Sequence, residues 1–324
     1  MADDPARYGI TIPLRGLVED RALVEELDTL GYTDAWSTET NVADAFTPLV
    51  LASQWSDRLR LGTAIVPAFT RGPALLAQTA AALAAAAPGR FILGLGSSSP
   101  VIVADWNGLD FDRPYQRTRD VLRFLRPALR GDKVSQEYAT FKVSGFRLGR
   151  APQVPPPVYL AALREGMLRL AGAEADGVIL NWLGAEDVTR CREVVEESAG
   201  GAHREVVARI FVVPSADAER ARAIGRRAIA AYLNVPAYAA FHEWLGRGPL
   251  LATMWAAWRA GDRRSALAAI PDEVVDALVV HGDPDSCRAH IARYVAAGVD
   301  TPTLAVIDPN ADSQQAVRAL APTR

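Results

Sequence analysis

Two stretches of the chain decide its fold: LRLGTAIVP at residues 59–67 and RFILGLGSSS at residues 90–99. Each begins as a short apolar run, which is typical of a strand buried on both faces of a parallel sheet. Each ends in small residues, and glycine there lets the backbone approach a ligand closely. Between them, Pro73 opens an alanine-rich segment that ends at Pro88-Gly89, which predicts a helix. This order predicts a parallel α/β fold with its site at the carboxyl ends of the strands.

The same alternation runs along nearly the whole chain. Apolar runs predict eight strands, at residues 8–12, 34–37, 59–64, 91–95, 158–161, 177–181, 206–213 and 303–307. Open doubly wound sheets rarely carry so many repeats, so we predict that residues 1–324 form a single (β/α)8 TIM-barrel domain. Three segments depart from the alternation, and we expect them as insertions at the C-terminal face, near residues 97–115, 131–150 and 235–282. The second alternates like a hairpin, and the third is aromatic and helical.

Composition excludes several classes of function. The net charge of the 324 residues is −3, which gives no indication of a nucleic-acid partner. No apolar run is long enough to predict a membrane span, and Met1 to Pro5 lack the features of a signal peptide. Cys191 and Cys287 predict free thiols, and no group of His, Cys or Asp has the spacing of metal ligands. We therefore expect a cytoplasmic protein that acts on a small molecule without a metal.

Five segments in fixed order carry a resemblance to a known family. They are GYTDAWSTE at 31–39, LGTAI at 61–65, RFILGLG at 90–96, VYLAALR at 158–164 and LAGAEADG at 170–177. With them, nearly the whole chain resembles the bacterial-luciferase-like superfamily, and within it the coenzyme F420-dependent oxidoreductases of actinobacteria. The resemblance implies a barrel with an insertion over its mouth and a flavin-type cofactor at the carboxyl ends of the strands.

The resemblance also implies which residues contact the cofactor. They are Ala64, Ile65, Gly96, Ser97, Ser98, Ala161, Ala162, Leu163 and Arg164. A cis peptide bond between Ala64 and Ile65 would place Ile65 behind the ring, whereas the alternative is an ordinary trans strand end. The segment that leads into Arg164 would hold the coenzyme's phosphate, because a helix N-terminus offers free amides. Arg164 is equally well explained as a solvated residue.

Glu39 is the predicted catalytic residue. It follows the second strand, where certain deazaflavin dehydrogenases of this superfamily carry a histidine. Its carboxyl group could move a proton if burial raised its pKa, could hydrogen-bond the ring or the substrate, or could lie at the surface. The predicted substrate contacts are Trp36, Ser99, Trp106 and Trp182. For Trp182, simple packing is nearly as good an explanation.

These observations predict a coenzyme F420-dependent oxidoreductase that transfers a hydride to or from a small organic substrate. One alternative is an FMN-dependent monooxygenase of the same superfamily, which would need a partner flavin reductase. Another is a barrel that binds a flavin-like ligand without chemistry. A homodimer is possible through the apolar segments 46–55 and 74–87, although both are equally well explained as barrel helices packing inward.

Overall fold

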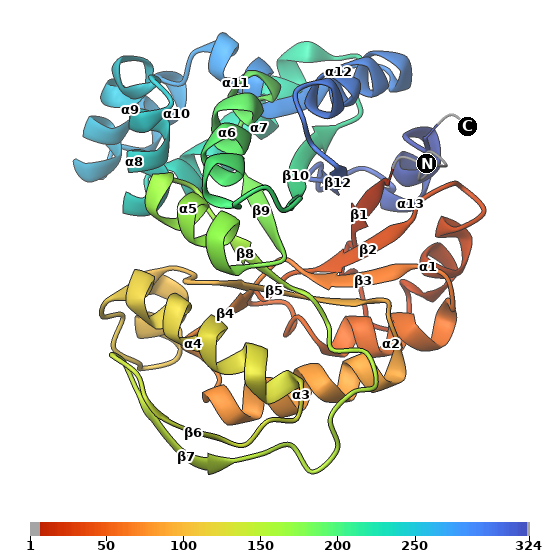
Figure 1. The fold of residues 1–324 in the computed structure, drawn as a ribbon. Helices are drawn as coiled ribbons and strands as arrows, with labels where there is room; N and C mark the ends of the chain where they lie inside the picture. The colour runs from red at the N-terminus through yellow and green to blue at the C-terminus, as the bar shows by residue number, and fades with distance from the viewer. Residues whose placement is uncertain (1–6, 323–324) are drawn as a thin grey trace.

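The apolar runs pair in parallel and close into a barrel of eight strands (Figure 1). The computed structural model describes residues 7–322, so the segment on which the signal-peptide prediction rests lies outside it. In order around the barrel the strands are β1 (Gly9–Thr11), β2 (Asp34–Ser37), β3 (Arg60–Thr63), β5 (Phe91–Gly96), β8 (Val158–Ala161), β9 (Gly177–Asn181), β10 (Glu205–Val213) and β12 (Thr301–Val306). β12 pairs with both β10 and β1, which closes the ring. The predicted TIM barrel is confirmed.

Helices surround this barrel and bury their apolar faces against it. They are α1 (Arg21–Leu27), α2 (Thr47–Trp55), α3 (Pro73–Ala86), α4 (Pro114–Leu129), α5 (Glu165–Glu174), α6 (Val188–Ser198), α7 (Ala218–Leu233), α12 (Pro284–Ala296) and α13 (Ser313–Ala319). Proline opens α3, α4 and α12, since the first helical residue needs no N–H donor. Among residues 7–322, the structure contains no helix with the length and hydropathy of a bilayer span.

Several short elements have no counterpart in the predicted pattern. They are β4 (Val66–Pro67), β11 (Val279–His281), the π-helical turn η1 (Val101–Trp106) and the 3₁₀ turn η2 (Ala185–Asp187). The helix α11 (Asp272–Leu278), by contrast, lies within the segment predicted to be helical. β4 pairs with the end of β5, and β11 pairs with the end of β10. Strands of two or three residues show no alternation in sequence, so only their tertiary pairing defines them.

The segment 131–150 forms the expected hairpin, with strands β6 (Val134–Glu137) and β7 (Lys142–Phe146). It does not stand over the barrel mouth as expected but packs along α4 (Figure 1). The ring of Phe124 in α4 lies 6.2 Å from that of Phe141 and 5.5 Å from that of Phe146. Burial of these rings against α4 explains the position of the hairpin.

The segment 235–282 contains α8 (Pro236–Trp244), α9 (Gly248–Arg259) and α10 (Arg263–Ala268), followed by α11 and β11. With α7, these helices enclose a second apolar core that includes Trp182 and Phe211. The amide Nδ2 of Asn181, at the end of β9, donates a hydrogen bond to the Tyr238 hydroxyl of α8 at 2.9 Å. The helical segment therefore stands beside the carboxyl ends of β9 and β10.

Alternate side chains of the strands point into the barrel and stack in layers. The middle layer is apolar and consists of Trp36, Ile92, Tyr159, Ile179 and Val207. Its largest ring fits because Gly62 has no side chain: a Cβ there would lie 2.3 Å from the Trp36 ring. A Cβ on Gly94 would lie only 1.8 Å from the Thr63 carbonyl oxygen. The two glycines thus permit the close approach on which the interior depends.

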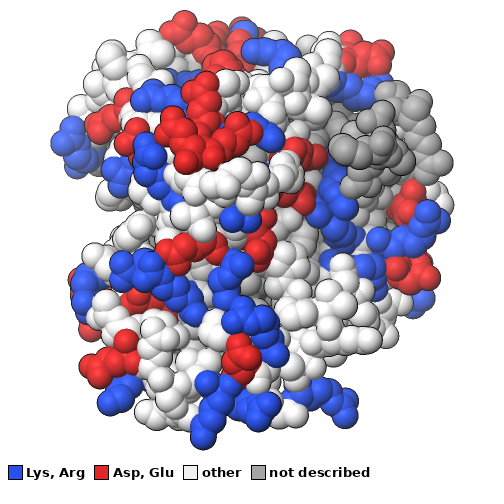
Figure 2. All heavy atoms as spheres, in the orientation of Figure 1, with Lys and Arg blue, Asp and Glu red and all other residues white. Residues whose placement is uncertain are grey.

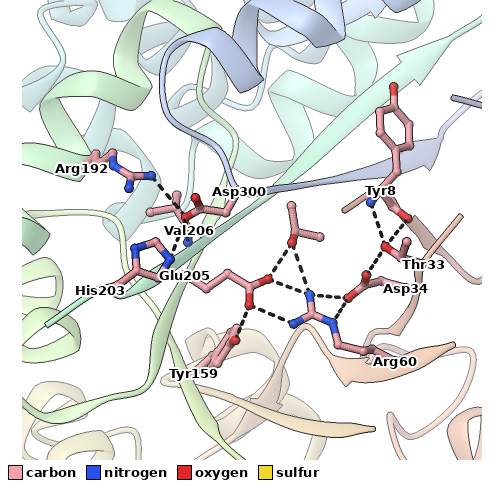
Figure 3. A network of polar contacts seen from close by, with 11 residues as sticks. Tyr8, Thr33, Asp34, Arg60, Tyr159, Arg192, His203, Glu205, Val206 and Asp300 are labelled. Carbon is pink, nitrogen blue, oxygen red and sulfur yellow. Dashed lines mark hydrogen bonds and ion pairs between the residues drawn. The ribbon is translucent and has the colours of Figure 1, made fainter. Parts of the chain in front are cut away.

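The layer at the amino ends of the strands is polar and is organised by Arg60 (Figure 3). Its guanidinium donates to Asp34 at 2.7 Å and to Glu205 at 2.9 and 2.6 Å. Glu205 also accepts from the hydroxyls of Tyr159 and Thr301, each at 2.6 Å. Burial opposes the ionisation of Glu205, but the hydrogen bonds and charge of Arg60 outweigh it and lower the pKa of Glu205 to about 2. Burial raises the pKa of Asp34, and Arg60 opposes that rise.

Replacing Gly94 with alanine is expected to lower the free energy of unfolding by about 3 kcal/mol, since the new Cβ meets backbone that cannot move independently of β3. Urea unfolding measures this change. The control is Gly72→Ala, where no atom lies within 4 Å of the new Cβ, and its effect should stay within about 0.5 kcal/mol. Equal effects of the two substitutions would contradict the crowding at Gly94.

Glu205→Gln is expected to lower the free energy of unfolding at pH 7 by about 3 kcal/mol, because Arg60 loses one of its two carboxylate partners. The folded-state pKa of Glu205, about 2, lies below its ordinary value of 4.5. Its stabilising effect is therefore complete above pH 4.5 and is lost as the pH falls toward 2.

The unfolding free energy of the Glu205→Gln variant should accordingly fall less steeply than that of the wild type in this acid window. Denaturant titrations at several pH values measure both slopes. Glu137→Gln is the matched control, since Glu137 is exposed and its Lys142 partner lies 3.8 Å away. Parallel pH profiles for the wild type and the Glu205→Gln variant would show that Glu205 does not carry the acid sensitivity.

Candidate functional site

Three of the predicted cofactor segments meet at the carboxyl ends of neighbouring strands. A Cβ built on Gly96 would lie 3.0 Å from the Ile65 side chain and 3.1 Å from Ala161. Ile65 and Ala161 are half-buried, and the peptide bond between Ala64 and Ile65 is cis, as the resemblance implies. Small or apolar residues from β5, β8 and the end of β3 therefore form one continuous wall.

The end of β3 is fixed to β5 by a side chain. The Thr63 hydroxyl donates to the Gly94 carbonyl at 2.9 Å and accepts from the Gly94 amide at 2.8 Å. Beyond the Ala64–Ile65 bond the chain resumes as β4, where Val66 pairs with Leu95. Because β5 is held on both sides of this bend, the Ile65 side chain is directed toward Gly96.

The serine segment turns sharply after β5. Ser97 and Ser98 are half-buried, and Ser98 has a positive φ of 65°. Ser99 starts η1, because its hydroxyl accepts from the Ile102 amide at 3.4 Å and its carbonyl from the Val103 amide. Trp106 ends η1 with 53% of its surface exposed. Ser97 and Ser98 therefore lie at the wall, whereas Trp106 stands mostly in solvent.

The predicted phosphate segment connects β8 to α5. Ala162 is buried and its amide already donates to the Ile179 carbonyl at 3.1 Å, so this amide is not available to a ligand. Leu163 is half-buried, and Arg164 is exposed. Within the part of the chain that the structure describes, no hydrogen bond or ion pair engages the Arg164 guanidinium. A cation without a partner at a helix N-terminus is compatible with an anionic ligand.

Glu39 is engaged by its own chain. Its Oε1 accepts from Arg71 at 2.7 Å and from the Thr70 hydroxyl at 3.1 Å. Its Oε2 pairs with the same guanidinium and accepts from the Ala45 amide at 3.3 Å. The guanidinium also lies over the Phe46 ring, 5.1 Å from its centroid. Both carboxylate oxygens are occupied by groups of the protein itself, so in this structure Glu39 holds the loop that carries Thr70 and Arg71.

Two predicted substrate contacts are buried. Trp36 has no exposed surface and lies against Gly62 inside the barrel. Trp182 is 1% exposed and stacks on Phe211, with ring centroids 3.9 Å apart. Because both rings are covered by the protein itself, neither offers surface to a substrate in this structure. For Trp182, this agrees with the packing alternative.

Sequence reasoning missed two arginines at this end of the barrel. Arg71, in the loop after β4, is the partner of Glu39, and no local motif indicates it. Arg209 interrupts the apolar strand β10 and lines a cavity of about 200 Å³ with Thr11, Thr38 and Ile307. The isolated charge in an apolar strand was a signal that could have identified Arg209. The cavity lies at the carboxyl ends of β1, β2 and β12.

A further cavity is lined by none of the predicted site residues. It is larger, about 570 Å³, and lies outside the barrel, between α3 and residues 148–154. Basic and acidic side chains are interspersed over the face shown in Figure 2. Among residues 7–322, no three His, Cys, Asp or Glu side chains gather in a group that could hold a metal ion.

Comparisons with known proteins match this architecture. The family model described as luciferase-like monooxygenase matches residues 7–301. A Mycobacterium tuberculosis protein, provisionally named a coenzyme F420-dependent oxidoreductase, is 28% identical, with 92% of each chain covered. The 5,10-methylenetetrahydromethanopterin reductase of Methanolobus tindarius is 27% identical over 83% of this chain and 84% of its own. The solved coenzyme F420-dependent tetrahydromethanopterin reductase of Methanopyrus kandleri superposes with a TM-score of 0.81 at 22% identity, covering 98% and 97%.

Glu39→Gln is expected to lower the free energy of unfolding by about 2 kcal/mol, since it leaves the shielded Arg71 guanidinium with only the more distant carboxylate of Asp44, 3.7 Å away. A double-mutant cycle with Arg71→Met, followed by urea unfolding, measures the coupling between the two side chains. Additive effects of the two substitutions would show that the pair does not stabilise the rim of the barrel.

Proposed function

Because the chain belongs to the luciferase-like monooxygenase family, we propose that it is a coenzyme F420-dependent oxidoreductase that transfers a hydride between the coenzyme and a small organic substrate. The relatives named for coenzyme F420 support this choice of cofactor. The family match covers the barrel and the candidate site alike, since residues 7–301 include every predicted cofactor contact.

The observation that carries the proposal is the contact between Ile65, Gly96 and Ala161. These residues lie half-buried or buried at three adjacent strand ends, and position 96 has room only because it lacks a side chain. A wall of small and apolar groups at the carboxyl ends of barrel strands fits a flat, largely apolar ring system. The residues present therefore fit the deazaflavin cofactor.

When bound, the deazaflavin ring supplies or accepts the hydride. The role of the protein is to hold this ring and to shield one face of it. Ile65 would back the ring, while Gly96, Ser97 and Ser98 would border its edge and the ribityl chain. Leu163 and Arg164, next to the free N-terminus of α5, would hold the phosphate.

The remaining predicted residues have less direct support. The occupied oxygens of Glu39 support a role in positioning the loop that carries Thr70 and Arg71. Proton transfer by Glu39 stays a prediction. Ser99 precedes η1 and Trp106 ends it, and both stay predicted substrate contacts.

An FMN-dependent monooxygenase is the second candidate, and the description of the family itself favours it. This enzyme would need a partner flavin reductase to deliver reduced FMN. A barrel that binds a flavin-like ligand without catalysis is the third candidate, and the engagement of Glu39 by Arg71 is compatible with it.

Titration of the purified protein with coenzyme F420 and, separately, with FMN is expected to show selective binding of F420. The dissociation constants are measured from the change in coenzyme fluorescence on binding. Gly96→Val should weaken F420 binding by at least about tenfold, because the added methyl groups displace Ile65 and enter the proposed ring site.

Gly149→Val is the matched control, since no atom lies within 4 Å of the new Cβ and the residue is exposed. Far-ultraviolet circular dichroism of both variants verifies that the barrel is intact. Selective FMN binding would turn the assignment to the monooxygenase. Unchanged F420 affinity in a folded Gly96→Val variant would move the cofactor site away from β5.

A further inference from the structure

The guanidinium of Arg209 is an inward charge at the carboxyl end of the barrel. On β10 it follows Glu205 of the polar layer and Val207 of the apolar layer, on the same face of the strand. Its register partners on the neighbouring strands are Asn181 of β9 and Thr303 of β12. Arg209 therefore belongs to the uppermost layer of the barrel interior.

No carboxylate of residues 7–322 forms an ion pair with Arg209. Arg60, Arg71 and Arg247 are similarly shielded, and each has a carboxylate oxygen within 2.9 Å. The Nε of Arg209 is sealed from solvent without a hydrogen-bond partner, and its guanidinium lies over the Phe211 ring at 4.9 Å. Burial lowers the pKa of Arg209, and the nearby Tyr232 and Tyr238 oppose this. An uncompensated cation in such a place is costly unless a ligand supplies the anion.

The neighbours of Arg209 are neutral hydrogen-bonding groups rather than counterions. The Tyr238 hydroxyl accepts from Asn181, so its own proton is free to be donated. Burial raises the pKa of Tyr238 to about 12, so this phenol stays neutral and does not balance the guanidinium. The hydroxyls of Thr11 and Thr303 and the amide oxygen of Asn181 are buried without partners among the described residues. Thr303 and Asn181 are the register partners of Arg209, and Thr11 lines the same cavity, so several polar atoms without partners lie at the level of the cation.

The strand order places Arg209 across the barrel from Ile65, the part of the proposed cofactor wall that follows β3. Counted in either direction around the ring, β10 is four strands away from β3. Ile65 follows β3, and Gly96 and Ala161 end the next two strands. A substrate between the two walls would therefore meet the cofactor on one side and Arg209 on the other. The cavity of about 200 Å³ that Arg209 lines limits this end of the substrate to a small group.

We propose that the substrate of this protein carries a carboxylate, which Arg209 binds through its guanidinium while the Tyr238 hydroxyl donates a further hydrogen bond. The planar fork of arginine matches a carboxylate in two parallel hydrogen bonds. This inference deepens the proposed function and rests on it for the position of the cofactor. The recognition of the anion itself rests on Arg209 and its neighbours alone.

Calorimetric titration of the protein with acetate, butyrate, hexanoate and benzoate, each compared with its amide, tests the proposal. The titrations are made with the apoprotein and again with saturating coenzyme F420. At least one acid should bind more tightly than its amide. Arg209→Met should weaken binding of that acid by about 10- to 100-fold and leave the amide unchanged. Arg209→Lys, which keeps the charge but loses the fork, should show a smaller loss and serves if the methionine variant fails to fold.

Arg227→Met is the matched control, since Arg227 is exposed on α7 and should not affect any of these titrations. Equal affinities of acids and amides for the wild type would overturn the proposal, as would unchanged acid affinity in the Arg209 variants. If Arg209→Met lowers the affinity for F420 as much as the affinity for the acid, Arg209 binds the coenzyme and not the substrate. If F420 fails to bind the wild type, the proposed function fails, whereas the apoprotein titrations still decide the role of Arg209.

Discussion

A single guanidinium, that of Arg60, joins the amino ends of the barrel strands. It reaches Asp34 on β2 and Glu205 on β10, and Glu205 extends the network to β8 and β12. Closing a barrel forces inward side chains of distant strands into one narrow space, where a polar group without a partner is costly. The network around Arg60 supplies partners to inward polar groups of β3 and of four further strands (Figure 3). The layers nearer the carboxyl ends depend on the spacing between strands that this network fixes.

The two ends of β10 use the same chemistry in opposite ways. At the amino end Glu205 is fully hydrogen-bonded, with Arg60 as its counterion. Four residues later Arg209 faces the same interior without a counterion among the described residues. Val207 and the ring of Trp36 separate the two levels. The lower level is a completed network, which suits stability, whereas the upper level is incomplete and suits the binding of a ligand.

Much of the fold could be predicted because each barrel strand is a short apolar run bounded by turn residues. The fixed order of five motif segments also indicated that Ile65, Gly96 and Ala161 lie together, and the structure brings them into contact. Contacts between distant residues could not be predicted. Glu39 and Arg71 are 32 positions apart with no motif between them, and the hairpin 131–150 is held along α4 by aromatic packing that alternation cannot locate. Likewise, the burial of Trp36 depends on the absence of a side chain at Gly62 on the next strand.

The separation of the two levels along β10 has an evolutionary consequence. Among the described residues, no hydrogen bond or ion pair joins the Arg209 side chain to the Arg60 network, and the apolar layer lies between them. Replacement of Arg209 by a neutral or acidic residue would change which ligands bind at the carboxyl ends of the strands. It would not weaken the Arg60 network at the amino ends. Proteins that share this barrel can therefore diverge in substrate through single substitutions at the carboxyl ends of the strands, while the polar network that stabilises the barrel stays the same.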